Sequence, residues 1–213
     1  ITGKGRCNIT NASDIAEIIK NIPGNGRFLQ SALNRFTNED IVELLESHGC
    51  PTKVERGNRV FPVSDKSQDV VDTLVKIYSE LGGKLKLDTQ VTEILTKEGQ
   101  ALGVKTKDGE YYFDAVILCG GGASYPGTGS DGSGARLASK VGHRIIELKP
   151  SLVPLESDYP YLEALQGLSL RNVRGTLLAD GKKIGEEFGE MLFTHFGVSG
   201  PIVLSLSNLA AKS

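Results

Sequence analysis

The feature that most constrains the fold is an unbroken apolar run, Asp114-Ala115-Val116-Ile117-Leu118-Cys119, with a glycine-rich loop directly after it. Such a run, bounded by turn residues, is typical of a parallel strand buried on both faces. The loop spans 120–134, and the spacing predicts a helix over Ala135–Val141. Strand, glycine loop and helix in this order predict an α/β fold with a nucleotide cofactor at the carboxyl edge of a sheet.

A second glycine-containing loop opens the chain as Ile1-Thr2-Gly3-Lys4-Gly5-Arg6-Cys7-Asn8-Ile9-Thr10-Asn11. Its glycines let backbone N–H groups approach a ligand, while Lys4 and Arg6 supply positive charge for a phosphate. A helix predicted directly after the loop adds partial positive charge. This pattern is typical of a loop that holds the phosphates or the ring edge of a nucleotide. The alternative is an ordinary loop with an asparagine cap.

The composition limits which classes of binding partner are expected. The net charge is −2 with both signs interspersed, which argues against nucleic acid and against an anionic membrane surface. Without a long apolar run or a signal peptide, the sequence predicts a soluble protein. We expect it to be cytoplasmic and to act on a small-molecule substrate. The three cysteines are widely spaced, which favours free thiols, and no His/Cys cluster has metal-ligand spacing. The oligomeric state stays open.

The pattern changes along the chain, and we expect a boundary near residue 150. Residues 1–150 are interpreted as a partial α/β cofactor-binding domain, with a helical segment at 13–49 and a β-meander at about 90–113. Residues 151–213 are expected to begin a β-rich domain. Thr37 and Asp40 have the spacing of a helix capping pair. The other predicted elements are a helix at 67–81 and strands at 52–63, 84–87, 90–96, 101–106, 110–113, 151–155, 168–173, 176–178 and 182–188.

One alternative is a domain that binds NAD. Gly127, Gly129 and Gly132 match the G-x-G-x-x-G spacing, and Glu147 lies twenty residues past the first of them, where a ribose-binding acid would stand. That fingerprint requires its first glycine at the end of a strand. Here seven residues separate the expected strand from Gly127, so the match has the wrong context.

With both loops in view, the chain resembles a bacterial NAD(P)/FAD-dependent oxidoreductase family, the aminoacetone-oxidase-like FAD-binding flavoproteins. The residues that carry the resemblance form three stretches in the order of the family, which together span nearly the whole chain. They are Thr2–Asn11, Gly120–Pro126 with Thr128–Gly132, and Gly189–Pro201.

The resemblance implies FAD, bound by a partial Rossmann-like domain into which a β-rich domain is inserted. NAD(P)H is an implied electron donor. The resemblance also places a strand with a true G-x-G-x-x-G before Ile1 and a closing segment after Ser213, and so implies a central fragment that by itself binds FAD weakly or not at all. The residues implied along the cofactor are Gly3, Lys4, Gly5 and, on the flavin side, Arg6, Cys7 and Asn8, with the backbone of Val91 at the adenine end and Gly120, Gly121 and Ala123 on the other flank.

Two residues are catalytic candidates. His195 is either a proton donor that faces the substrate or a structural histidine, and Cys7 is either a redox thiol near the flavin or a small buried residue. The sequence therefore predicts part of an FAD-dependent oxidoreductase of unspecified substrate. The alternatives are a nucleotide-binding module without catalysis and the NAD-binding domain described above.

Overall fold

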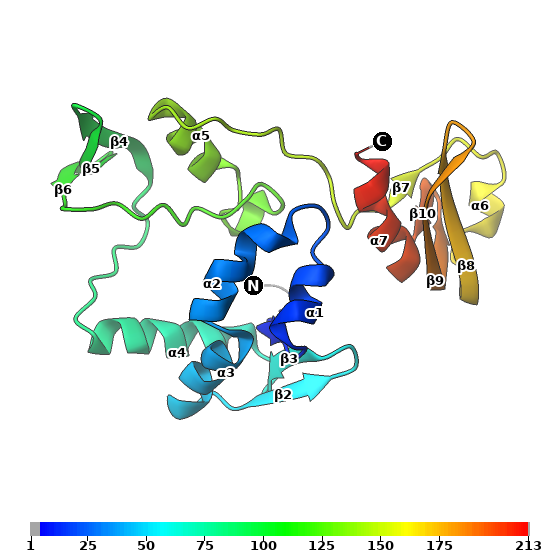
Figure 1. Ribbon diagram of the computed structural model, residues 1–213, viewed down its shortest axis with the longest axis horizontal. Coiled ribbons are helices and arrows are strands. Elements are labelled where there is room, and N and C mark those ends of the chain that lie inside the picture. The colour runs from blue at the N-terminus through cyan, green and yellow to red at the C-terminus, as the bar shows by residue number, and fades with distance from the viewer. Residues whose placement is uncertain (1–4, 213) are drawn as a thin grey trace. The chain divides into compact units, whose positions relative to one another are not determined.

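The computed structural model describes residues 5–212 and divides the chain into two compact units, Ile1–Ile145 and Ile146–Ser213. Each unit is described by itself. Figure 1 shows the elements of both, coloured along the chain. Within the described residues, no helix combines the length and the apolar composition that a membrane span requires.

The first unit begins with a three-stranded antiparallel sheet in the order β1-β3-β2. Its strands are β1 (Thr10–Asn11), β2 (Thr52–Glu55) and β3 (Arg59–Pro62). The helices around it are α1 (Ile15–Lys20), a 3-10 turn η1 (Gly26–Leu29), α2 (Gln30–Arg35), α3 (Asn38–Ser47) and α4 (Ser67–Glu80). The predicted helical segment is confirmed. So is the capping pair, because the Thr37 side chain accepts from the N–H of Asp40 while the Asp40 carboxylate accepts from the N–H of Thr37.

The two faces of this sheet differ because side chains alternate along each strand. Val60 is 1% exposed and lies between Thr10 and Val54 of the neighbouring strands, on one face. Phe61 pairs with Lys53 and belongs to the other face, which is polar. The hydrophobic core nearby consists of Leu45, Cys50 and Val70, with Cys7, Ile9 and Ile41 packed against it.

A second antiparallel sheet, in the order β4-β5-β6, follows later in the same unit. It contains β4 (Val91–Lys97), β5 (Gln100–Thr106) and β6 (Gly109–Tyr112), so the predicted hairpin across Lys107-Asp108-Gly109 is confirmed. A short 3-10 turn, η2 (Pro126–Thr128), and the helix α5 (Ser133–Lys140) complete the unit. The segment at 84–87, predicted as a strand, has no regular secondary structure.

The predicted buried strand at 114–119 is wrong. These residues form no strand, and the side chains of Ile117 and Leu118 are 87% and 41% exposed. A parallel strand needs neighbours that supply hydrogen bonds on both sides. Every strand pair in the described part of the chain is antiparallel, and none involves this segment.

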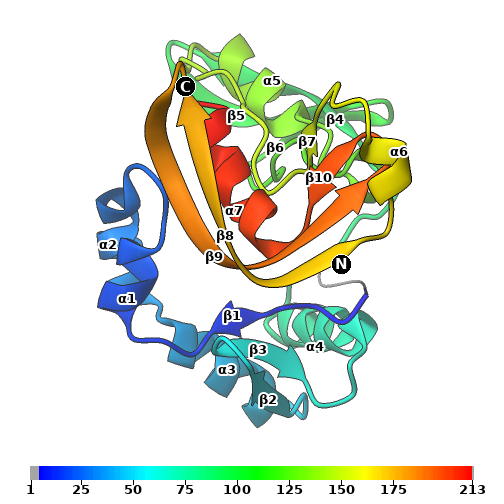
Figure 2. The same ribbon diagram turned by 90° about the vertical axis from the view of Figure 1, so that its right-hand side faces the viewer.

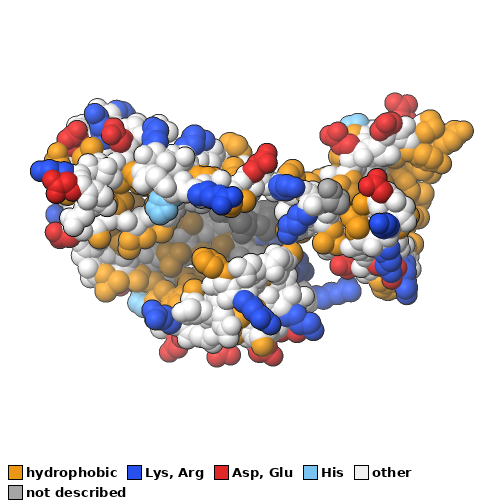
Figure 3. Space-filling view, turned by 45° about the horizontal axis from the view of Figure 1, so that its top comes forward, with side chains coloured by type: hydrophobic (Ala, Val, Ile, Leu, Met, Phe, Trp, Pro, Cys, Tyr) orange, Lys and Arg blue, Asp and Glu red, His pale blue; other side chains and the backbone are white. Residues whose placement is uncertain are grey.

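Apolar stripes of two helices are also less buried than their spacing predicts. In the stripe that runs through η1 and α2, Phe28 is 79% exposed and Phe36 is 53% exposed. In α4, Val70 is buried, whereas Leu74 is 41% exposed. Figure 3 shows hydrophobic side chains at the surface, interspersed with charged ones. Helical spacing therefore predicted the helices correctly, but it did not predict how deeply their apolar faces are covered.

The second unit is a four-stranded antiparallel sheet, in the order β7-β10-β9-β8, that curves around a helix (Figure 2). Its elements are β7 (Leu155–Glu156), α6 (Leu162–Leu165), β8 (Ser169–Ala179), β9 (Lys182–Thr194), β10 (Gly197–Ser199) and α7 (Pro201–Ala210). The predicted strands at 168–173 and 176–178 are one continuous strand, β8. Of the strand predicted at 151–155, only Leu155 is in β7.

Two glycines in the hairpin of β8 and β9 allow α7 to pack closely against it. A Cβ atom at Gly185 would lie 2.5 Å from Leu209 Cδ1, and one at Gly175 would lie 3.0 Å from Ile202 Cδ1. These glycines stand where α7 packs against the strands, so they give the helix room to approach. In the sequence they look like interruptions, whereas in the structure they are packing positions.

Candidate cofactor pocket

A pocket of about 470 Å³ lies where the start of β4, the beginning of the glycine loop and the start of α5 meet. It contains two of the residues predicted to hold a cofactor, Val91 and Gly120, although they are far apart in the sequence. Its full lining is Thr89, Gln90, Val91, Leu118, Gly120, Pro126, Gly129, Asp131, Ser133, Gly134 and Leu137. This size is within the range of small-molecule and cofactor sites.

Close backbone packing shapes the pocket wall. A Cβ atom at Gly120 would lie 3.0 Å from Gly134 Cα, so these two backbones approach each other as only glycines allow. The loop between them is held by its own hydrogen bonds. Tyr125 and Ser130 pair through both of their N–H groups at 3.3 Å, and the N–H of Gly132 donates to the carbonyl oxygen of Gly122 at 2.9 Å. The loop is therefore an ordered turn that brings backbone to the edge of the pocket.

Asp131 places a carboxylate at the pocket, directly before α5. Its Oδ1 accepts from the N–H of Ser133 at 2.9 Å, and its Oδ2 lies 3.2 Å from the Arg136 guanidinium. The hydrogen bonds from Ser133, with a smaller contribution from Arg136, hold the pKa of Asp131 below its usual range. Asp131 is therefore a charged acceptor at neutral pH.

The chemistry of the lining is that of a nucleoside site more than of a phosphate site. None of the lining residues is a lysine or an arginine, and the one charged group is the carboxylate of Asp131. A carboxylate accepts hydrogen bonds from ribose hydroxyls, and exposed backbone can hydrogen-bond a base edge. Asp131, Ser133 and Gln90 were missed as site residues. The Asp-Gly-Ser sequence directly before the helix was the signal that could have found the first two.

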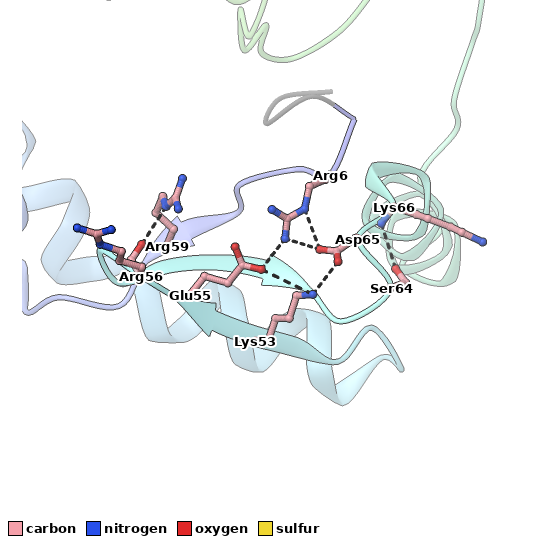
Figure 4. A network of polar contacts seen from close by, with 8 residues as sticks. All are labelled: Arg6, Lys53, Glu55, Arg56, Arg59, Ser64, Asp65 and Lys66. Atoms are coloured by element: carbon pink, nitrogen blue, oxygen red, sulfur yellow. Dashed lines mark hydrogen bonds and ion pairs between the residues drawn. The ribbon is translucent and has the colours of Figure 1, made fainter. Parts of the chain in front are cut away.

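The opening loop lies elsewhere in the first unit, and its arginine already has protein partners. Arg6 Nη2 is 2.5 Å from Glu55 Oε1 and 2.6 Å from Asp65 Oδ1, and Lys53 Nζ is 2.7 Å from Asp65 Oδ2 (Figure 4). The Arg6 guanidinium also lies over the ring of Phe61, 4.3 Å from its centroid. The charge of Arg6 is thus balanced by two carboxylates, and these ion pairs hold the loop on the sheet.

The other residues of this loop pack and hydrogen-bond locally. Gly3 and Lys4 lie outside the described residues. The carbonyl oxygen of Gly5 accepts from the N–H of Ser67 at 2.8 Å, at the start of α4. Cys7 has a left-handed backbone (φ 63°) and packs against the core. The Asn8 amide, in the orientation that satisfies its neighbours, donates to the carbonyl oxygen of Thr10 at 3.1 Å.

The remaining candidates in the loop at 120–134 are Gly121 and Ala123, and both face the inside of the loop more than the pocket. A Cβ atom at Gly121 would lie 3.3 Å from Ser130 Oγ, and one at Gly132 would lie 3.5 Å from the Cβ of Ala123. Neither Gly121 nor Ala123 is part of the pocket lining. They support the turn that carries Gly129 and Asp131 to the pocket.

The NAD alternative finds little support. Its glycines are in η2 and at the start of α5, and no strand precedes them, because 113–124 contain none. The fingerprint needs that strand to aim the phosphates at the helix. Glu147 belongs to the second unit.

His195 lies in the turn between β9 and β10 in the second unit. Its ring is exposed and packs edge-on against Phe196, with centroids 5.0 Å apart and planes at 86°. This geometry is that of a surface aromatic pair. Within residues 5–212, no group of three His, Cys, Asp or Glu side chains is placed to hold a metal ion.

Comparison with known proteins identifies the family. The model of the "HI0933-like protein Rossmann domain", a family associated with flavoproteins, matches residues 1–204. The ribosomal RNA dihydrouridine synthase of Escherichia coli is 30% identical over 98% of this chain and 50% of its own length. The 3-dehydro-bile acid delta(4,6)-reductase of Clostridium scindens is 31% identical over 99% of this chain and 50% of its own.

A second ribosomal RNA dihydrouridine synthase, from Haemophilus influenzae, is 31% identical over 98% of this chain and 51% of its own length. The chain thus spans about half the length of these curated relatives. The predicted fold class is confirmed as an α/β, Rossmann-like one. The chain belongs to the HI0933-like Rossmann domain family.

Proposed function

We propose that the pocket beside Gly120 and Asp131 holds the adenosine part of FAD, in an FAD-dependent oxidoreductase. The observation that carries the proposal is the close approach of Gly120 to Gly134, next to a charged acceptor. A Cβ atom at Gly120 would crowd this cradle, and the Asp131 carboxylate suits ribose hydroxyls. Membership in a family associated with flavoproteins supports the same assignment.

The reaction class is proposed from the relatives. Dihydrouridine forms when the ring double bond next to a carbonyl of uridine is saturated, and a 3-dehydro-delta(4,6) bile acid carries double bonds conjugated to a ketone. Both names describe reduction of a carbon–carbon double bond conjugated to a carbonyl. We infer a substrate of that class for the whole protein. The net charge of this chain, −2, favours a small molecule over RNA as the ligand of this part of the protein.

When bound, FAD would supply the two-electron chemistry, and the protein would orient it and the substrate. NAD(P)H is proposed as the electron donor. The narrower resemblance to aminoacetone-oxidase-like enzymes stays a prediction. Arg6 is assigned a positioning role, because its ion pairs with Glu55 and Asp65 hold the opening loop on the sheet.

A competition experiment tests the adenosine assignment. The chain is titrated with FAD, ADP and FMN while ligand binding is followed by calorimetry. We expect FAD and ADP to compete and FMN, which lacks adenosine, to bind at least tenfold more weakly, because the pocket contributes no contact to a flavin ring. Gly120→Val should weaken both FAD and ADP, while Gly122→Val, at a position with nothing within 4 Å of its Cβ, should leave them unchanged. Equal binding of FMN and FAD contradicts the assignment.

Similar binding measurements separate the two alternative functions, a nucleotide-binding module without catalysis and an NAD-binding domain. A nucleotide-binding module without catalysis would bind ADP, yet bound FAD would not be reduced by NAD(P)H in a protein that spans the full length of the relatives. A dinucleotide site built on Gly127, Gly129 and Gly132 predicts that Glu147→Ala weakens NAD binding, and indifference to that change removes it.

A further inference from the structure

A second groove, outside the proposed cofactor pocket, lies between α3 and the apolar face of the β1-β3-β2 sheet. Its volume is about 390 Å³. Figures 1 and 2 show α3 beside β2 and β3. The residues that line it are Thr10, Ala12, Asn38, Glu39, Val42, Glu43, Glu46, Ser47, Thr52, Val54 and Val60. Nothing in the proposed function uses this groove.

The floor of the groove is apolar and partly open to solvent. Val60 is buried at its base, while Val54, its neighbour across the sheet, is 59% exposed. Val42 of α3 stands on the opposite wall. Val42 and Val54 thus present partly open apolar surface above Val60, and this surface gains free energy when an apolar group covers it.

The rim of the groove is acidic. Glu39, Glu43 and Glu46 all come from α3, and no lysine or arginine lines the cavity. The whole helix, Asn-Glu-Asp-Ile-Val-Glu-Leu-Leu-Glu-Ser, has four acidic residues and no basic one. Two glutamates four residues apart on one helix repel each other, so a cation placed between them is favoured. Among the described residues, none of these three glutamates forms an ion pair.

The basic side chains of the sheet are on its other face. Lys53 pairs with Phe61 across the strands, opposite in orientation to Val54, and its ammonium group bonds Asp65. Figure 4 shows Lys53 and Arg59 on the polar face with Arg6. The field in the groove is therefore set by the glutamates of α3.

An accessible acceptor oxygen adds to this pattern. Asn38 is 8% exposed and lines the groove. Both of its side-chain hydrogen bonds within residues 5–212 are donated by Nδ2, to the carbonyl oxygens of Asn11 at 2.8 Å and Ser13 at 3.0 Å. Its Oδ1 keeps the capacity to accept. At the other end, Glu46 Oε1 accepts from the N–H and the hydroxyl of Thr52, and these bonds hold the pKa of Glu46 below its usual range.

From this combination we propose that the groove binds an organic cation with an apolar body, of the class of alkylammonium ions. The ammonium group would lie among Glu39, Glu43 and the Asn38 oxygen, and the alkyl chain would cover Val42 and Val54. Within the described part of the chain, the carboxylates of Glu39 and Glu43 have no protein cation as a partner, so they favour a ligand that donates hydrogen bonds and carries positive charge. The valine side chains cannot replace the water shell of a metal ion, so they disfavour a hydrated metal ion. Charge complementarity decides between this occupant and a neutral or anionic one.

The test uses hexylammonium chloride as the probe, with hexanol and hexanoate as neutral and anionic partners of the same chain length. Binding to the chain is followed by amide chemical shifts in NMR. We expect hexylammonium to shift the signals of Val42 and Val54, and hexanoate to leave them in place. Because each carboxylate contributes a modest, partly screened attraction, Glu43→Gln should weaken hexylammonium about threefold.

The matched control is Glu163→Gln, which removes the same charge from an exposed position in α6. It should leave the affinity unchanged. Two results would overturn the proposal. One is that hexanol and hexylammonium bind equally, which would make the groove merely apolar. The other is that Glu163→Gln and Glu43→Gln have the same effect, which would make the attraction a matter of net charge. Neither result bears on FAD binding at Gly120.

Discussion

The two glycine-containing loops look alike in the sequence and differ in the structure. The opening loop carries charge, and that charge is used internally: Arg6 bridges Glu55 and Asp65 and covers Phe61. The loop at 120–134 bonds mainly to itself and leaves backbone and the Asp131 carboxylate at a pocket. Whether a basic residue beside glycines is free to bind a phosphate depends on the protein carboxylates within its reach, and the sequence does not state those distances.

The largest expected effect comes from adding a side chain at the close contact between Gly120 and Gly134. Gly120→Val places a side chain against the backbone of Gly134, 3.0 Å from the added Cβ, and should lower the free energy of unfolding by about 1–3 kcal/mol. Urea unfolding measures the loss. Gly122→Val is the control, since its Cβ would have nothing within 4 Å. Equal destabilisation by both variants would show that the close contact is not what constrains this loop.

A smaller effect should follow from breaking the ion pairs of the opening loop. Arg6→Met keeps an aliphatic cover over Phe61 and removes the charge. Hydrogen bonds from Lys53 and Arg6 lower the pKa of Asp65, and the hydrogen bond from Arg6 lowers that of Glu55. A carboxyl group whose pKa is lower in the folded than in the unfolded protein stabilises the fold at pH values above its unfolded-state pKa of about 4. That stabilisation is lost as the pH falls through the pKa of the folded state.

Wild type should therefore be more stable than Arg6→Met at pH 7, and the difference should disappear in strong acid, where both carboxyls are protonated. Thermal unfolding at a series of pH values measures it. A difference that stays constant with pH would mean that Arg6 acts by packing alone. High salt should reduce the difference at pH 7, because the pairs are partly exposed.

The smallest effect concerns backbone strain at Cys7. Its φ of 63° is in the left-handed region, which favours glycine. The variants Cys7→Gly and Cys7→Ala both lack the thiol, so they differ only in the Cβ atom that disfavours a left-handed backbone. The glycine variant should be more stable by about 0.5–1 kcal/mol, measured by urea unfolding. The opposite order would mean that the loop leaves this conformation in solution.

The sequence predicts features that depend on residues close together in the chain. The Thr37 and Asp40 side chains of the capping box are three positions apart, and the hairpin of β5 and β6 depends on the two-residue turn Lys107-Asp108, which Thr106 and Gly109 close by pairing. Asp180 and Gly181 likewise turn β8 into β9, with positive φ values of 48° and 76°. In each case the local chemistry is sufficient to determine the conformation.

Features that depend on distant partners were missed. The partners of Arg6 lie 49 and 59 residues away, so nothing near Arg6 in the chain indicates them. The run at 114–119 has the composition of a buried strand, but a strand also needs neighbours, which composition does not supply. The pocket was predicted in part. Val91 and Gly120 both line it, as predicted, whereas Asp131 was missed because its place directly before a helix is not evident within a glycine-rich stretch.

The glycines of the second unit have a consequence for variation. Gly175 and Gly185 face α7, so any larger side chain there must displace Ile202 or Leu209. Between them, Thr176 and Glu186 are exposed on the opposite face of the same hairpin. In a library of all single substitutions, survival along β8 and β9 should alternate from one position to the next. The inner row of the hairpin accepts little change in size, while its outer row is free to acquire new chemistry.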